Sequence, residues 1–257
     1  MPTEHPRLSD RVALVTGVSR PSSIGAGIAE RLHRSGATVV ATGWPAHDDE
    51  MPWGSDDFDP DFELRHRDLE DPTAPAKIVD EVVDDHGRID IVIATHARSS
   101  SQTLDELTID ELGRSWAANV ASVLLLAQQF ARRHEPVAAP ETPTGRMIWF
   151  TSGQHLGPMP DELAYAVTKA ALHGMTTSLD RALGSTRIIG NCINPGPVDT
   201  GWADPDVHAR VAGMFPDGRW GTPTDIADVV HFLVSDEGAW IRGQVLDCEG
   251  GFHRFPI

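Results

Sequence analysis

Residues Arg11 to Gly25 read RVALVTGVSRPSSIG, and this stretch decides the fold class. Its apolar run, which ends at Thr16, predicts a buried β-strand, and the small residues after it predict a tight turn. The recurrence of Ile24, Ile28 and Leu32 predicts that a helix begins directly after the turn. Glycine lets the backbone approach a ligand closely, and a helix N-terminus offers unpaired N–H groups to an anion. The stretch therefore predicts a phosphate-binding strand–turn–helix unit, with an ordinary turn as the alternative.

The same alternation of strands and helices continues along the chain. Strands are predicted at 11–16, 38–42, 62–67, 89–95, 146–151, 188–193 and 244–247. Helices are predicted between Ile24 and Gly36, around 78–83 up to Gly87, and at 108–130, 165–183 and 224–234. Prolines at 136, 140 and 143 indicate a loop before the fifth strand. About seven strands in this order predict a doubly wound α/β fold with a parallel sheet, whose ligand lies beyond the carboxyl ends of the strands.

Composition narrows the class of protein. The chain has 257 residues without a low-complexity linker or internal repeat, so we expect a single domain over 1–257. Its net charge of −17 argues against a nucleic-acid partner. No apolar stretch approaches the ~18–20 residues of a membrane span, and the polar N-terminus resembles no secretory signal. Cys192 and Cys248 are too few for a disulfide framework and lack metal-ligand spacing, so we expect free thiols, no metal site and a cytoplasmic location.

One segment departs from the regular alternation. Between Asp48 and Asp71 the chain carries eleven acidic residues against Arg65 and Arg67. Such a run usually forms a solvated face that keeps a protein soluble, so we expect a surface excursion. An ion site or a partner site is the alternative.

The strongest chemical signal is the sequence YAVTK from Tyr165 to Lys169. It contains the chain's single tyrosine and one of its two lysines. Residues four apart share a helix face, so the phenol and the ammonium are expected to project toward one site. A nearby ammonium stabilises a phenolate, and we therefore expect Lys169 to lower the pKa of Tyr165 from its usual value near ~10. Ser152, at the end of the preceding strand, is placed to donate a hydrogen bond to an oxygen that gains negative charge.

Together these segments resemble the short-chain dehydrogenase/reductase family, whose glycine motif is usually T-G-x-x-x-G-x-G. Gly17 and Gly25 match that motif, whereas the turn has two extra residues and Ser23 replaces the middle glycine. The family's catalytic set is Asn, Ser, Tyr and Lys, with Ser about thirteen residues before Tyr. Ser152 and Tyr165 have this separation. The resemblance implies that Asn119, within WAANV, organises a proton relay to the lysine.

The resemblance extends over nearly the whole chain. The segment NPGPVDTG from Asn194 to Gly201 is similar to the family segment that lies against the nicotinamide, and Thr200 would bond its carboxamide. Asp68 and Leu69 resemble the pair that holds the adenine. The segment ATHA at 94–97 stands where most members have N-N-A-G. Implied cofactor contacts are Gly17, Ser19, Arg20, Ile24, Gly25, Asp68, Leu69, Ala94, Tyr165, Lys169, Pro195, Gly196, Val198 and Thr200.

The cofactor preference depends on the end of the second strand. NAD-dependent enzymes place a carboxylate there, against the ribose 2′-hydroxyl, whereas this chain has Thr42, Gly43 and Trp44. Arg20 in the glycine turn is placed to pair with a 2′-phosphate. The sequence therefore favours NADP(H). NAD(H) stays the alternative because acidic residues at 48–50 follow closely.

The resemblance implies an NAD(P)-dependent oxidoreductase with a doubly wound Rossmann fold, which interconverts a ketone and a secondary alcohol. A reductase of 3-oxoacyl thioesters on an acyl carrier protein is the activity the family suggests most often. A sensor or scaffold that binds the cofactor without catalysis is the alternative function. By the same resemblance, the small-molecule substrate meets residues 153–161 and a lid around 200–220, and the chain assembles as a homodimer or homotetramer.

Overall fold

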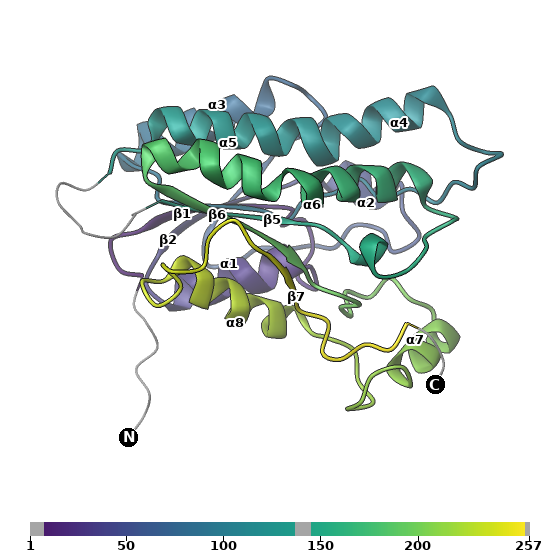
Figure 1. Ribbon diagram of the computed structural model, residues 1–257. Helices are drawn as coiled ribbons and strands as arrows, with labels where there is room; N and C mark the ends of the chain where they lie inside the picture. Colours follow the sequence, from purple (N-terminus) through teal and green to yellow (C-terminus); the bar gives the residue numbers. More distant parts are fainter. Residues whose placement is uncertain (1–7, 137–144, 255–257) are drawn as a thin grey trace.

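The computed structural model describes residues 8–136 and 145–254 (Figure 1). The predicted proline loop lies outside these residues beyond Pro136. One sheet holds seven parallel strands in the order β3-β2-β1-β4-β5-β6-β7. The strands are β1 (Val12–Thr16), β2 (Thr38–Gly43), β3 (Glu63–His66), β4 (Ile91–Ala94), β5 (Gly145–Phe150), β6 (Ile188–Asn194) and β7 (Val245–Asp247). This doubly wound order confirms the predicted fold class.

Helices cover both faces of the sheet (Figure 1). The helices on one face are α3 (Ala74–His86), α4 (Ile109–Trp116), α5 (Ser122–Arg133) and α6 (Leu163–Leu183). On the other face lie α1 (Ile24–Arg34) and α8 (Pro223–Val234). The predicted continuous helix at 108–130 is wrong in one respect, since a π-helical turn at Ala117–Ala121 separates α4 from α5. Such turns occur mostly at functional sites.

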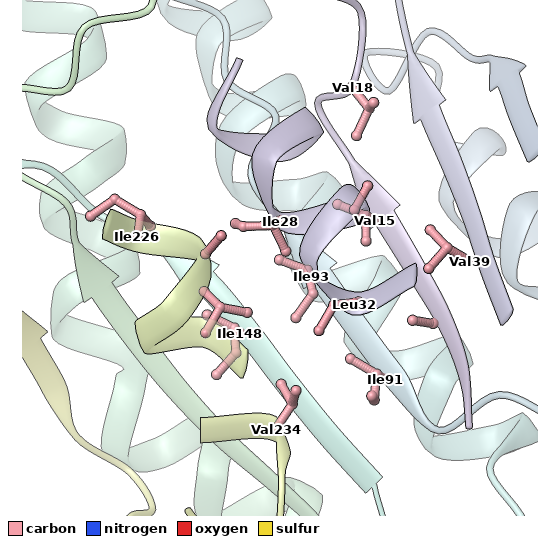
Figure 2. Packing of buried hydrophobic residues seen from close by; sticks show 14 of the residues in the cluster. Val15, Val18, Ile28, Leu32, Val39, Ile91, Ile93, Ile148, Ile226 and Val234 are labelled. Atoms are coloured by element: carbon pink, nitrogen blue, oxygen red, sulfur yellow. The ribbon is translucent and has the colours of Figure 1, made fainter. Parts of the chain in front are cut away.

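Two apolar clusters hold the layers together, one on each face of the sheet. Figure 2 shows the cluster under α1 and α8, where Ile28 and Leu32 pack toward Ile93 and Ile148 from the central strands. The second cluster joins α3, α5 and α6 to the opposite face, with Trp149 at its centre and fully buried. Because β1, β4 and β5 are covered on both faces, their sequences are mostly apolar and do not alternate, with Thr16 in β1 and Arg146 in β5 as the polar exceptions.

Four short helical elements were absent from the sequence prediction. They are α2 (Pro45–Asp49), α7 (Pro205–Ala212) and the 3-10 turns at Gly153–His155 and Gly184–Thr186. No residue of α7 is buried, and this short helix has few apolar residues at helical spacing, such as Val207 and Val211, too few for a periodic pattern to be detected. Its stabilising feature is a cap: the carboxylate of Asp204 accepts hydrogen bonds from the N–H groups of Asp206 and Val207, both at 2.9 Å.

The structure bears on two expectations drawn from composition, those about the cysteines and about membrane spans. Cys192 and Cys248 are both free thiols, the first buried and the second half-buried. Within residues 8–136 and 145–254, no helix combines the length and the apolar character needed to cross a membrane.

Replacement of Leu32 tests the packing of α1 against the sheet. Leu32 has no exposed surface, and Leu32→Ala is expected to lower the free energy of unfolding by about 2–5 kcal/mol. Leu104 is 73% exposed, and Leu104→Ala is the matched control, with an expected change within about 0.5 kcal/mol. Urea denaturation measures both. Equal effects of the two variants would contradict this account of the core.

Candidate active site

A cleft of about 990 Å³ opens at the carboxyl ends of the strands, where residues following β1 and β4 meet. This volume lies at the upper end of the usual range for ligand pockets, about 300–1,000 Å³. The strand order reverses between β1 and β4, and ligands of doubly wound sheets bind outside such a reversal. The position of the cleft is therefore a consequence of the topology.

The turn between β1 and α1 leaves no room for side chains. Gly17 has φ +74°, and a Cβ there would lie 2.6 Å from the backbone nitrogen of His96. A Cβ at Gly25 would lie 2.5 Å from the carbonyl oxygen of Gly17 and 2.7 Å from the hydroxyl of Thr95. The two glycines thus let the turn pack closely against the segment that follows β4.

Ser23 explains the departure from the usual glycine pattern. It is the N-cap of α1, and its hydroxyl accepts a hydrogen bond from the N–H of Ala26 at 3.0 Å. Serine is among the preferred residues at this position. The first residues of α1, Ile24 and Gly25, line the cleft, so this helix end directs its N–H groups and the positive end of its dipole there.

The donor set at this end of the cleft suits a dinucleotide. The hydroxyl of Thr42, at the end of β2, is buried and has no partner among the described residues, and Thr42 lines the cleft. An unpaired buried hydroxyl in a ligand cleft is normally satisfied by the ligand. With the α1 N-terminus for a pyrophosphate and Thr42 for a sugar hydroxyl, the residues present fit a nicotinamide dinucleotide.

The acidic segment at 48–71 is not simply a solvated loop, so this expectation is wrong for part of it. Asp48 is buried, lines the cleft, and accepts a hydrogen bond from the indole N–H of Trp53 at 3.0 Å. Met51, Pro52 and Trp53 also line the cleft. The segment therefore forms a wall of the binding site, and two of the residues that interrupt its acidic run, Pro52 and Trp53, line the cleft there.

Arg20 bridges three parts of this wall. Its Nε donates to Asp56 at 3.1 Å, and its Nη2 donates to the carbonyl oxygen of Thr200 at 2.9 Å and to Ser22 at 3.1 Å. The guanidinium also lies over the ring of Trp53, 5.8 Å from the centroid. Arg20 lines the cleft, so a charged group that enters there meets an arginine already bound to a carboxylate.

Tyr165 and Lys169 lie one turn apart at the start of α6. The ammonium Nζ is 5.3 Å from the centroid of the Tyr165 ring and donates a hydrogen bond to the carbonyl oxygen of Phe150 at 2.9 Å. The hydroxyl of Thr151 donates in turn to the carbonyl oxygen of Lys169 at 2.8 Å. These bonds fix α6 to the end of β5, so that Ser152 and Tyr165 both line the cleft.

Burial dominates the protonation of this pair. It raises the pKa of Tyr165 to about 12, against a lowering by the hydrogen bond with Ser152 and with a further increase caused by Glu162. Burial also lowers the pKa of Lys169 to about 8. The expectation that Lys169 already lowers the pKa of the phenol is therefore wrong. At neutral pH the site presents a neutral phenol beside an ammonium.

Asn119 lies in the π-helical turn and is fully buried. Its side-chain oxygen accepts from the N–H of Arg98 at 2.6 Å, and its Nδ2 donates to the carbonyl oxygen of Arg98 at 3.0 Å and to the hydroxyl of Thr168 at 2.9 Å. That hydroxyl donates to the carbonyl oxygen of Tyr165 at 2.7 Å. Asn119 thus connects the segment after β4 to the helix turn of the tyrosine.

His96, which stands in the altered ATHA segment, joins the same scaffold. Its Nδ1 is 2.6 Å from the hydroxyl of Thr16, and its Nε2 is 2.7 Å from the hydroxyl of Ser122. The Ser122 hydroxyl donates to the carbonyl oxygen of Ala118, so Nε2 carries the proton and Nδ1 accepts. Burial, and then the charge of Lys169, lower the pKa of His96 to about 3, which keeps the ring neutral.

The predicted site residues divide into two groups. Those that line the cleft are Gly17, Ser19, Arg20, Ile24, Gly25, Asp68, Leu69, Ser152, Tyr165, Pro195, Gly196, Val198 and Thr200. Ala94, Asn119 and Lys169 lie behind this lining and are 2%, 0% and 2% exposed. Thr95 to Ala97 line the cleft in place of Ala94.

Sequence reasoning missed several lining residues. They are His47, Trp53, Arg98, Glu162, Phe252 and Arg254, among others. Glu162 was not detectable from helical spacing, because it precedes α6 and has a non-helical backbone conformation. Phe252 and Arg254 were not detectable either, since they follow the last strand and reach the cleft only through the tertiary fold.

Few residues of the two segments expected to meet the substrate, 153–161 and the lid around 200–220, line the cleft. From 153–161, Gly153 and Met159 line the cleft, and from the lid around 200–220 only Thr200 and Trp202 do. Part of the lid packs on the C-terminal segment, where Phe215 and Phe252 lie 5.0 Å apart between ring centroids and the N–H of His253 donates to the carbonyl oxygen of Met214 at 2.8 Å. Figure 1 shows α7 beside the segment that follows β7.

The fold and this tyrosine–lysine site define the class of protein: the chain belongs to the short-chain dehydrogenase/reductase family and is an oxidoreductase of that family. A family model described as enoyl-(acyl carrier protein) reductase matches residues 17–253.

Known relatives match over almost the whole chain. An uncharacterized oxidoreductase of Bacillus subtilis, YjdA, is 36% identical over 252 residues, which cover 95% of this chain and 98% of the relative. The 3-oxoacyl-[acyl-carrier-protein] reductase FabG of Escherichia coli is 30% identical and covers 95% and 97%. The crystal structure of a short-chain dehydrogenase from Burkholderia cenocepacia in complex with NADP has a TM-score of 0.80 at 31% identity, and the match covers 95% of this chain and 98% of that one.

Gly25→Ala tests the close packing of the glycine turn. The new Cβ would clash with backbone, so we expect the free energy of unfolding to fall by about 1–3 kcal/mol, together with weaker binding in the cleft. Gly113 in α4 is the control, because nothing lies within 4 Å of its Cβ position. Gly113→Ala should stabilise by about 0.5–1 kcal/mol in the same urea titration. A stable Gly25→Ala protein would overturn the packing argument.

Proposed function

We propose that this enzyme interconverts a ketone and a secondary alcohol, with NADP(H) as the favoured cofactor and NAD(H) as the alternative. The observation that carries the proposal is the neutral phenol of Tyr165 in the cleft, one helix turn from the buried ammonium of Lys169. The bound nicotinamide supplies or accepts the hydride. We assign the catalytic roles to Asn119, Ser152, Tyr165 and Lys169, with Asn119 organising a proton relay to the lysine.

In ketone reduction, Tyr165 donates its proton to the carbonyl oxygen as negative charge develops there. Ser152 donates a hydrogen bond to the same oxygen, and the charge on Lys169 stabilises the phenolate that remains. A pKa of about 12 keeps the phenol protonated at neutral pH, which suits a general acid. The positive charge of Lys169 then supports the proton transfer at the moment when the phenolate forms.

The cofactor proposal rests on the end of β2 and on similarity. Thr42, Gly43 and Trp44 line this part of the cleft together with Arg20 and Arg67, and two arginines suit a 2′-phosphate. The similar Burkholderia dehydrogenase is complexed with NADP. Asp48 favours NAD(H) instead, since its second carboxylate oxygen is buried without a partner among the described residues.

A 3-oxoacyl thioester is the finer substrate proposal that the similarity to FabG supports. The surface supports a carrier-protein partner poorly. Arg133 on α5 is an arginine that could contribute to a basic docking patch, but it is paired with Asp80 at 2.9 Å and Asp84 at 2.6 Å, and the net charge of −17 repels an acidic carrier. A small-molecule ketone needs no such docking.

The remaining proposals concern the enzyme as a whole. We propose a single domain over 1–257 with a lid around 200–220, a cytoplasmic location, and assembly as a homodimer or homotetramer without nucleic acid. Exposed apolar side chains on α4, α5 and α6 support the assembly, since Trp116, Leu124 and Val167 are 47%, 41% and 54% exposed.

Tyr165→Phe tests the catalytic proposal. Removal of the hydroxyl should lower kcat by about 10²-fold to 10⁴-fold for any ketone that the wild type reduces, because the proton donor is lost. Steady-state oxidation of NADPH measures the rate, and fluorescence titration of NADPH and NADH measures cofactor binding, which should persist and favour NADPH. Full activity of the variant would refute the assignment.

The pH profile tests the role of Lys169. Because burial lowers its pKa to about 8, its charge is lost at lower pH than that of an exposed lysine. The kcat for ketone reduction should therefore fall as the pH rises through about 8. Lys169→Met should show a lower kcat throughout and no such decline. A wild-type profile that stays flat from about pH 6 to about pH 10 would contradict this role.

A further inference from the structure

Glu162 places a carboxylate in the cleft that the proton transfer does not use. It directly precedes α6, stands three residues before Tyr165 and lines the cleft. Although it is the N-cap residue of α6, its side chain caps no N–H group. Among the residues that the structure describes, none forms a hydrogen bond or ion pair with this carboxylate.

An unpaired carboxylate in a half-buried position is costly. Burial, and then the adjacent charge of Asp161, raise the pKa of Glu162. A charged group that is partly removed from water without donors loses hydration and gains nothing in return. Donors supplied by a ligand would remove that cost. Because the ionised carboxylate only accepts hydrogen bonds, the complementary ligand group is an O–H or N–H.

The wall next to Glu162 is also polar. Gln102 pairs with Glu162 in a short parallel bridge, and the N–H of Leu163 donates to the carbonyl oxygen of Gln102 at 3.5 Å. The preceding residues, 99–101, are three serines, and all three line the cleft. This loop thus brings hydroxyl groups to the side of the cleft where α6 begins.

Arg254 does not compensate the charge of Glu162. It reaches the cleft from the C-terminal segment and lies over Gly153, where a Cβ would clash with its guanidinium. Its Nη2 donates to the carboxylate of Glu249, which also accepts from the side chain of Asn194 at 2.8 Å. The arginine is therefore already paired, whereas Glu162 is not, so this end of the cleft favours donors over anions.

We propose that Glu162 determines substrate specificity by accepting a hydrogen bond from an O–H or N–H group next to the reactive carbon of the substrate. Glu162 and Tyr165 line the same cleft, and the carboxylate lies close enough to the phenol for its charge to raise the pKa of Tyr165, so a group near the Tyr165 hydroxyl is within reach of Glu162. The preferred substrates are then small hydroxy-ketones or amino-ketones and the matching alcohols. This inference rests on the proposed function and departs from the 3-oxoacyl thioester, which has no donor beside its ketone.

Three ketones of equal size test the inference. Butanone, hydroxyacetone and aminoacetone share the fragment CH3–CO–CH2. They differ only in the group bound to its CH2 carbon, which is a methyl, a hydroxyl or an ammonium group. The measurement is kcat/KM with NADPH, expressed as the ratio of each donor-bearing ketone to butanone, for the wild type, Glu162→Leu and Glu162→Gln. Each ratio is compared between the wild type and the variants, so the different intrinsic reactivities of the three ketones cancel. Thermal melting and NADPH binding verify that each variant is folded.

We expect Glu162→Leu to lower both ratios by about tenfold or more, mainly through KM, as for a lost hydrogen bond to a charged group. Glu162→Gln keeps an acceptor oxygen but loses the charge, so it should retain more of the hydroxyacetone ratio than of the aminoacetone ratio. This arm distinguishes a hydroxyl ligand from an ammonium ligand, and it replaces the leucine variant if that protein does not fold. Asp105→Asn is the control, because Asp105 is exposed and outside the lining, and it should leave both ratios unchanged.

Ratios that stay the same in the wild type and both Glu162 variants would overturn the inference while the proposed function stands. A wild type that reduces none of the three ketones, nor larger ones, would instead refute the proposed function and the inference with it.

Discussion

The site depends on the removal of Tyr165 and Lys169 from water at the point where α6 meets the end of β5. Desolvation moves both groups toward their neutral forms, so the phenol holds its proton more tightly and the ammonium less tightly. A phenol in this state is a proton donor, and a lysine in this state is close to losing its charge at moderately alkaline pH. Because burial raises the pKa of Tyr165 and lowers that of Lys169, the ligand-free site favours proton donation by the phenol, as ketone reduction requires.

The scaffold that maintains this burial is a set of short hydrogen bonds between segments distant in sequence. Lys169 is bound to the carbonyl oxygen of Phe150, and Asn119 holds both Arg98 and Thr168. His96 connects Thr16 at the end of β1 to Ser122 at the start of α5. These contacts link the nucleotide side of the cleft to the catalytic side, so that the π-helical turn containing Asn119 is held from three directions.

Much of this arrangement was predictable because parallel strands covered on both faces have continuous apolar sequences. The inner strands, the helices that cover the sheet and the cleft at the carboxyl ends followed from that pattern. The edge strands β3 and β7 were predicted as well, although their sequences, ELRH and VLD, do not show it. The π-helical turn was not predictable, since it does not interrupt the apolar periodicity around Asn119. The role of the acidic segment was also missed. Its charge pattern indicates solvent, whereas the packing of Trp53 and Asp48 into the cleft is decided by tertiary contacts. The sign of the pKa shift at Tyr165 was wrong because sequence shows the neighbouring ammonium but not the burial that outweighs it.

The most direct test of the account is a spectrophotometric titration of Tyr165 in the ligand-free protein. The chain contains a single tyrosine, so the phenolate absorbance reports this group alone, and Tyr165→Phe supplies the baseline. Circular dichroism follows the fold over the same pH range. The account predicts no phenolate while the protein is folded until the pH is well above ~10, the usual value for tyrosine. A phenolate that appears near neutral pH in the folded protein would contradict it.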